Sequence, residues 1–218
     1  MADNNTTEIT PWSFLADSEA ENYFARVDYA LKKGRHIQQW KEQAYWFRFI
    51  ANNEESIKQY YRIYFGIRLE HGGEANDKYY YLDFMPDSRG NIPVDNRHFL
   101  QNEYVIVGFM LYKAVFIDGY VELTSVKAFQ RMLRQDYEEF KEGLFRVLAK
   151  AKNLKITEMT ERKMDAVVAN AMKAFEKIGW IELQEDSFEV LSSFQRLPKL
   201  YADYINNIDE WIKIEATK

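Results

Sequence analysis

The sequence twice places an amphipathic helical segment directly before a glycine and a β-hairpin. In the first instance Gly66 follows the helical residues, and the two strand-like runs that come next are separated by Gly72 and Gly73. In the second instance Gly179 stands at the same place, and the strand-like runs flank the polar turn of residues 184–187. Glycine suits the left-handed position just after a helix. The two closures therefore predict two small units of the same kind.

Apolar residues recur at helical spacing ahead of both hairpins. The expected helices of the first unit cover residues 18–33 and 39–52 and a third segment that starts after Asn53. Ser18 with Glu21 is expected to form a capping box, and Asn53 is expected to cap the third helix. A short extended piece at residues 35–37 is expected between the first two helices.

The second unit repeats this order with longer helices. Helices are expected over residues 100–117, from Thr124 or Ser125 to Leu148 without a break, and from a Thr160 cap to the second glycine closure. Residues 120–123 are expected to form a short strand. Three helices followed by a two-stranded wing is the winged-helix pattern. The predicted fold class is mainly α with small β wings, arranged as tandem winged-helix domains plus a C-terminal helix.

The chain is expected to divide into five parts. These are an N-terminal tail (1–17), a first winged-helix domain (18–84), a linker (85–96), a second winged-helix domain (97–191) and a C-terminal helix (192–218). The linker prediction rests on Pro86, Gly90 and Pro93 among Asp and Asn residues. The last part has an apolar stripe, which either packs back on its own unit or helps to form a protein interface. The stripe consists of Tyr201, Tyr204, Ile205, Ile208, Trp211 and Ile212.

Composition excludes several classes of protein. The chain has 218 residues, a net charge of −5 and no cysteine, so disulfides and thiolate metal sites are impossible. The N-terminal residues are polar and lack the apolar core of a signal peptide. The longest apolar stretch, residues 104–117, has 14 residues and includes Lys113. A membrane span needs about 20 residues, so we expect a buried helix, no membrane association and a cytoplasmic location.

Catalytic and cofactor signatures are missing from the sequence. Gly72 and Gly73 are an isolated pair in a hairpin turn and do not form a phosphate-binding loop. His36, His71 and His98 are far apart and do not pair at helical spacing. We therefore predict no catalytic residue, no metal and no cofactor, and an enzyme with an unrecognised site is kept only as a rival class.

The charge of the chain is unevenly distributed. Residues 146–177 hold eight basic and four acidic residues, although the whole chain is acidic. This segment includes the helix in the position that winged-helix proteins place against nucleic acid. Either the basic side chains contact DNA phosphates without reading sequence, or they form an ordinary solvated helix face. Asn170 is the one good base-reading side chain in the middle of this helix, which argues against sequence-specific readout. The candidate phosphate contacts are Lys150, Lys152, Lys155, Arg162, Lys163 and Lys173.

The end of the first helix shows a family resemblance. An amphipathic helix that ends in Gly34-Arg35-His36-Ile37 and is followed by two aromatic-rich helices resembles the start of MukE, the accessory subunit of the bacterial MukBEF condensin. The polar linker, the long apolar helix and the lysine-bearing helix then follow in the same order. The resemblance spans about residues 23–191. The chain lacks the long acidic tail of MukE and is more similar to the shorter MksE-like relatives. We interpret Gly34, Arg35, His36 and Ile37 themselves as a structural turn.

The resemblance implies a non-enzymatic subunit of an SMC–kleisin complex of the MksBEF type. It implies a tandem winged-helix homodimer that binds the kleisin subunit (MksF- or MukF-like) beside an SMC ATPase (MksB- or MukB-like). From the basic segment we expect the chain to assist in weak, non-specific DNA holding at the nucleoid. The role would be chromosome organisation and segregation or defence against plasmids. The alternative is a free-standing winged-helix transcription regulator, which would bind DNA alone and tightly.

Overall fold

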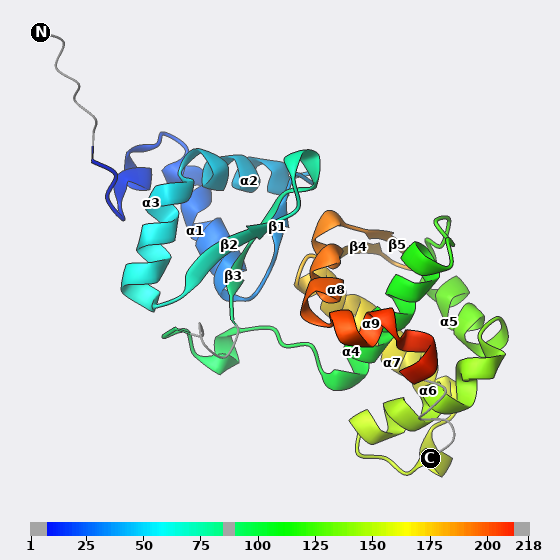
Figure 1. Cartoon of the computed structure of the whole chain (residues 1–218). Coiled ribbons are helices and arrows are strands. Elements are labelled where there is room, and N and C mark those ends of the chain that lie inside the picture. Colours follow the sequence, from blue (N-terminus) through cyan, green and yellow to red (C-terminus); the bar gives the residue numbers. More distant parts are fainter. Residues whose placement is uncertain (1–7, 85–89, 212–218) are drawn as a thin grey trace, which may run out of the picture. The chain divides into compact units, whose positions relative to one another are not determined.

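A computed structural model describes residues 8–84 and 90–211 of the chain (Figure 1). The chain divides into two compact units, Met1–His98 (unit 1) and Phe99–Lys218 (unit 2). Each unit has its own cluster of buried apolar side chains. Helices dominate both units, and each unit has one small antiparallel sheet. The predicted fold class, mainly α with small β-sheets, is confirmed.

Unit 1 packs three helices on a three-stranded antiparallel sheet of order β1-β3-β2. Leu69 on β2 pairs with Leu82 on β3, and Ile37 on β1 pairs with Tyr80 on β3. These strand residues face a core that also contains Val27 and Ile57 from the helices. The elements are η1 (Ser13–Ala16), α1 (Ala20–Lys32), β1 (Ile37–Gln38), α2 (Gln43–Asn52), α3 (Glu54–Tyr60) with a π-helical turn (Tyr61–Phe65), β2 (Arg68–Gly72), η3 (Ala75–Asp77), β3 (Tyr79–Asp83) and η4 (Val94–Asn96).

Unit 2 is built around α4, which is buried along almost its whole length. Gly108 allows close packing here, since an added Cβ would lie 3.2 Å from Leu197 and 3.4 Å from Phe175. The elements are α4 (Asn102–Tyr112) with a π-helical turn (Lys113–Ile117), α5 (Val126–Gln135), α6 (Glu138–Ala151), η6 (Ile156–Glu158), α7 (Glu161–Lys177), β4 (Ile181–Gln184), β5 (Ser187–Val190), η7 (Ser192–Gln195), α8 (Arg196–Leu200) and α9 (Ala202–Asn206). In the part of the chain that is described, no helix has the length and apolar character needed to cross a membrane.

The two units share one order of strand pairing. In unit 1, β3 lies between β1 and β2. In unit 2, β5 pairs with β4 on one side, and Ser187 at its start forms an isolated antiparallel bridge with Ser125 on the other. Ser125 therefore corresponds to β1, placed between the first two helices of its unit. The designation of both units as winged helices stays a prediction.

Several expected details of unit 2 are wrong. The helix expected from Ser125 to Leu148 is two helices, because the chain leaves helical geometry at Tyr137. The hydroxyl of Tyr137 donates to the carboxylate of Asp118, and this long-range contact favours the break. Val121 and Glu122 form a turn, and the strand expected over residues 120–123 is reduced to the bridge at Ser125. The side chains of Ser125 and Thr160 accept from the backbone N–H groups of their helices, so both of these predicted caps are confirmed.

Of the two caps predicted for unit 1, the capping box is wrong and the Asn53 cap is right in position only. The N-cap of α1 is Glu19, without a side-chain cap, so Ser18 and Glu21 form no capping box there. Asn53 does stand at the N-cap of α3, but its side chain does not accept from the helix. Its amide donates instead to Asp17 at 2.6 Å and to the carbonyl of Phe49 at 3.0 Å. The amide thus connects the end of α2 to η1.

The C-terminal segment, as far as Trp211, packs on its own unit. Ile205 and Ile208 are buried in the core of unit 2. The ring of Phe109 on α4 lies 5.4 Å from that of Tyr201 and 6.1 Å from that of Trp211. The segment is broken into η7, α8 and α9, and is not the continuous helix that was expected. Ile212, the last member of the expected stripe, lies outside the described residues.

A buried lysine joins this segment to the end of α4. Lys113 is 5% exposed and forms ion pairs with Asp118 at 3.0 Å and Asp209 at 2.9 Å. Burial alone would lower the pKa of Lys113, but the carboxylates of Asp209 and Asp118 outweigh it and raise that pKa. The ammonium group therefore stays charged, and its charge is compensated inside the unit.

Phe175 on α7 is predicted to be a main stabilising residue of unit 2. Its side chain is fully buried, with ring centroids 5.8 Å from Trp180 and 6.1 Å from Phe194. Phe175→Ala should lower the free energy of unfolding by about 3–5 kcal/mol, because it leaves a cavity in the core. Chemical denaturation followed by circular dichroism measures the loss. Ile156→Ala, at an exposed apolar side chain, is the control and should change stability by less than about 0.5 kcal/mol. A loss below about 1 kcal/mol for Phe175→Ala would contradict this account.

Candidate nucleic-acid interface

The exposed side of α7 carries a group of basic side chains. The helix begins at the Thr160 cap and buries Met164, Val168 and Phe175 in the core of unit 2. Its opposite side is exposed and carries Arg162, Lys163, Lys173 and Lys177. We call these four residues the basic face. Arg162 and Lys173 are eleven residues apart, which places them on nearly the same side of the helix and about 16 Å apart along its axis.

The acidic side chains at the start of α7 are compensated by basic residues of other helices. Glu161 forms an ion pair with Lys141 on α6, and Asp165 forms one with Arg134 on α5. The hydrogen bond from Lys141 lowers the pKa of Glu161, so this carboxylate is ionised and stays paired. The positive charge of the basic face is therefore not cancelled by Glu161 or Asp165. Sequence reasoning missed Lys141 and Arg134, because each lies 20 or more residues from its partner.

The other candidate lysines lie between α6 and α7. Lys150 is exposed in the last turn of α6, Lys152 is the C-cap of that helix, and Lys155 is exposed at the N-cap of η6. Lys152 forms an ion pair at 3.0 Å with Glu103, whose side chain is only 7% exposed. Its charge is therefore committed to a buried carboxylate on α4. All three lysines are exposed, and the ion pair with Glu103 distinguishes Lys152 from Lys150 and Lys155.

Gly34 to Ile37 end α1 and start the sheet of unit 1. Gly34 has φ +87°, its N–H donates to the carbonyl of Leu31, and the N–H of Arg35 donates to the carbonyl of Ala30. This double closure is a Schellman motif, in which glycine takes the left-handed position. His36 is buried, with its ring 5.3 Å from that of Tyr81, and Ile37 is fully buried in β1. The interpretation of these four residues as a structural turn stays a prediction.

Metal chemistry has no support in the described residues. They contain no group of three or more His, Cys, Asp or Glu side chains that could hold a metal ion.

The basic face places several positive charges on one side of α7. A surface of this kind attracts anions, phosphate groups in particular.

The sequence matches the model of one known protein family. The family model of the condensin complex protein MksE matches residues 22–201. The chain belongs to the MksE family. The match includes both sheets, α7 with its basic face, and the Gly34 motif, and it confirms the resemblance stated from the sequence. The MksE-family chain is accordingly a component of a condensin-like complex. A search of curated proteins returns no match.

The pairing of Lys152 predicts an effect on stability. Lys152→Ala leaves the buried carboxylate of Glu103 without its counter-ion, and should lower the free energy of unfolding by about 1–3 kcal/mol. Lys150→Ala is the matched control, because Lys150 is exposed and close in sequence, and it should change stability by less than about 0.5 kcal/mol. Urea denaturation of both variants measures the difference. Equal stabilities of the two variants would show that solvent screens Glu103.

Proposed function

We propose that this chain is a non-enzymatic subunit of an SMC–kleisin complex, in which it binds the kleisin and helps to hold DNA beside the SMC ATPase. The family match over residues 22–201 carries the proposal, because MksE is a condensin complex protein. ATP hydrolysis belongs to the SMC partner in this proposal, and the chain works by binding at the nucleoid. The biological role is chromosome organisation and segregation or defence against plasmids.

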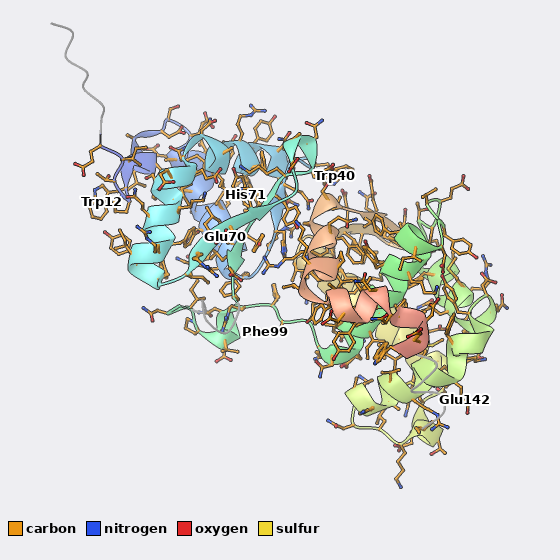
Figure 2. The ribbon with its side chains drawn as sticks, in the orientation of Figure 1. Trp12, Trp40, Glu70, His71, Phe99 and Glu142 are labelled. Atoms are coloured by element: carbon orange, nitrogen blue, oxygen red, sulfur yellow. The ribbon has the colours of Figure 1, made fainter. Side chains whose placement is uncertain are left out.

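Exposed apolar side chains in unit 1 support a protein partner. Trp12, the N-cap of η1, is 55% exposed (Figure 2). Its ring lies 5.8 Å from that of Tyr64 in the π-helical turn after α3. Leu15 and Ile63, near these residues in sequence, are also exposed. Phe14 is the residue of η1 that enters the core, and its N–H donates to Ser56 on α3. The apolar group around Trp12 is therefore held on a fixed surface, and fixed exposed aromatic side chains are typical of binding hot spots.

A second exposed apolar group lies in unit 2. It consists of four side chains in one short stretch after the start of the π-helical turn. The four are Phe116, Ile117, Tyr120 and Val121. The ring of Phe116 stacks on that of Tyr112 at 4.9 Å, so it is positioned by α4. Exposed apolar groups of this kind mark interaction sites. We propose that one of the two groups mediates self-association into a homodimer and that the other contacts the kleisin.

The basic face supports an auxiliary DNA contact. We propose that Arg162, Lys163 and Lys173, together with Lys150 and Lys155, contact phosphates, and that each unit serves as a winged-helix module. Lys152 is also one of the six candidate phosphate contacts, but its ammonium group forms an ion pair with Glu103. Asn170 is the one amide on the exposed side of α7, which favours non-specific contact over the base reading of a transcription regulator.

The assembly can be tested with the complete chain and the proteins encoded beside it. At micromolar concentration the chain should sediment as a dimer, and it should co-elute with a kleisin from the same genome in size-exclusion chromatography. Phe116→Ser with Ile117→Ser should weaken one of these two associations, because it replaces exposed apolar side chains by polar ones. Ile156→Ser, at an exposed apolar residue outside both groups, is the control. A monomer that also fails to co-elute with the kleisin would refute the proposed function.

The DNA contact has its own test in the assembled complex. Lys163→Glu with Lys173→Glu should weaken binding equally for duplexes of different sequence. It should also reduce the salt slope by about one unit for each phosphate contact that is lost. Fluorescence anisotropy of a labelled duplex over a salt series measures both effects.

A charge-matched control separates local contact from net charge in this DNA test. Lys41→Glu with Arg48→Glu makes the same charge change at exposed positions of unit 1. The chain alone should bind duplex DNA only weakly, at about 10⁻⁴ to 10⁻⁶ M. Superimposed curves for the two double variants, with the complex intact, would show that α7 does not touch DNA.

A further inference from the structure

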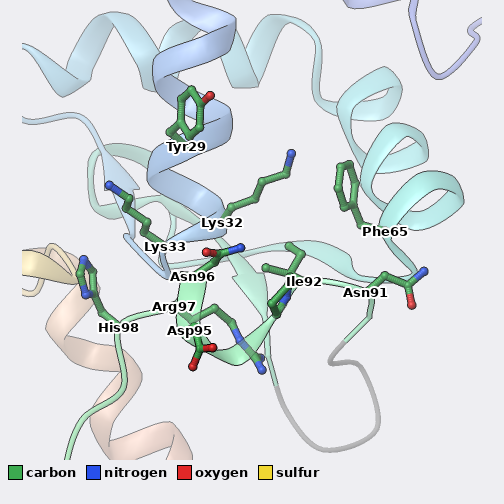
Figure 3. Close-up of a pocket in the computed structure, with 11 residues that line it drawn as sticks. Tyr29, Lys32, Lys33, Phe65, Asn91, Ile92, Asp95, Asn96, Arg97 and His98 are labelled. Atoms are coloured by element: carbon green, nitrogen blue, oxygen red, sulfur yellow. The ribbon is translucent and has the colours of Figure 1, made fainter.

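Strand β2 is an edge strand of the unit 1 sheet, because the strand order is β1-β3-β2. Alternate residues of an edge strand direct their backbone N–H and C=O groups away from the sheet. Just before β2 the backbone is covered, since Gly90 packs against Phe65 and Ile67, and the N–H of Asn91 donates to the carbonyl of Phe65 at 2.7 Å (Figure 3). Along residues 69–72, no described residue outside the sheet forms a backbone hydrogen bond to the strand. These four residues therefore present an open edge.

Helix α3 runs beside this open edge. Glu54 at the start of α3 accepts a hydrogen bond from the hydroxyl of Tyr80, which lies opposite His71 of β2 (Figure 2). At the other end of the helix, the N–H of Ile67 donates to the carbonyl of Tyr61 at 3.3 Å. The start of α3 thus lies near the end of β2, and the end of α3 lies near its start. Helix and strand run side by side in opposite directions.

A groove of about 290 Å³ lies between the helix and the strand. Its helix wall carries Glu55, Lys58, Gln59 and Arg62, and its strand wall consists of residues 68–70. Successive side chains of a strand point to opposite faces of the sheet, so a groove lined by three consecutive residues lies along the edge of the strand. An extended peptide in this groove can pair with β2 while its side chains contact α3. This arrangement is the geometry of β-strand addition.

The charges of the strand wall are compensated within unit 1. Arg68 forms an ion pair with Asp83 at 2.8 Å and a longer one with Glu70 at 3.7 Å. On the helix wall, Lys58 forms an ion pair with Glu54 at 2.7 Å. These side chains therefore add little net charge to the groove.

Two opposite charges of the helix wall remain available to a ligand. Glu55 lies in the first turn of α3 and Arg62 in the π-helical turn that follows it, and both side chains are exposed. Neither forms an ion pair with a described residue. The two residues are about 10 Å apart along the helix axis, and same-side residues of an extended peptide are about 7 Å apart. Long side chains on one side of such a peptide can therefore reach both charges.

We propose that the open edge of β2 binds an extended segment of a partner protein as an additional strand, with a basic side chain of that segment at Glu55 and an acidic one at Arg62. Main-chain hydrogen bonds supply affinity, and the two opposite charges determine the direction of the segment. The proposal rests on the proposed function in one respect, since the complex must supply the partner. It adds a contact that is made by backbone groups and charges and not by the exposed apolar side chains.

Amide hydrogen exchange of the full chain, followed by NMR with and without the kleisin from the same genome, tests the strand addition. Two alternate amides among residues 69–72 pair with β3 and should exchange slowly in the chain alone. The other two point outward and should exchange fast. Binding of the kleisin should slow these outward amides at least about tenfold, because they then donate to the added strand.

A charge variant tests the helix wall. Arg62→Glu should weaken kleisin binding about tenfold or more, because a charge that attracts the acidic side chain becomes one that repels it. Arg26→Glu makes the same charge change at an exposed position of α1 outside the groove, and should bind the kleisin like the wild type. The thermal midpoint of each variant is measured, and both should unfold like the wild type because both side chains are exposed.

Three results would overturn the proposal. These are a kleisin complex in which the outward amides of β2 exchange as fast as in the free chain, a wild-type affinity of Arg62→Glu for the kleisin, and slow exchange of these amides in the chain alone that depends on protein concentration. The last result would assign the edge to a second copy of the chain. A complex that forms without protecting β2 leaves the proposed function standing, whereas a chain that does not bind the kleisin at all refutes both, so the two failures are distinguishable.

Discussion

The burial of α4 on all sides is the constraint on which unit 2 depends. A helix whose apolar residues extend around its whole circumference must be covered by other elements. Here α6, α7 and the C-terminal segment contribute side chains to the same core. The arrangement brings two charged residues of this helix and its π-helical turn, Glu103 and Lys113, into buried positions. Each is compensated by a residue distant in sequence, Lys152 for Glu103 and Asp209 for Lys113. Packing of one apolar helix thus determines which charges remain available at the surface.

Much of the local structure could be predicted because its causes are local. Glycines at positions 66 and 179 end helical segments, and Ser125 and Thr160 cap the helices that follow them. The errors arise where a distant residue decides the local conformation. The break at Tyr137 coincides with a hydrogen bond to Asp118, which no pattern within the helix reveals.

The candidate sites show the same division between local and distant information. The basic segment was visible as a run of charge, and the exposed positions of Arg162, Lys163 and Lys173 follow from helical spacing. The ion pair between Lys152 and Glu103 could not be predicted, because the two residues are 49 positions apart in the sequence. The contact between the end of α1 and residues 91–98 was also hidden. In the sequence, residues 32–33 read as a helix end, residues 91–96 as a linker and residues 97–98 as the start of the second domain. Backbone hydrogen bonds from Asn91 to Phe65 and from His98 to Lys33 join this segment to unit 1.

Both units contain a π-helical turn, at Tyr61–Phe65 and Lys113–Ile117. Each turn includes two adjacent exposed apolar residues, Ile63 with Tyr64 in one and Phe116 with Ile117 in the other. A π-helical turn accommodates one residue more than an α-helical turn, so it corresponds to a single-residue insertion that the preceding helix tolerates. The core-facing residues before the insertion keep their phase, while those after it are rotated by about 100° around the axis. Evolution can therefore change which side chains these helix ends present to partners by gaining or losing one codon, without redesigning either core.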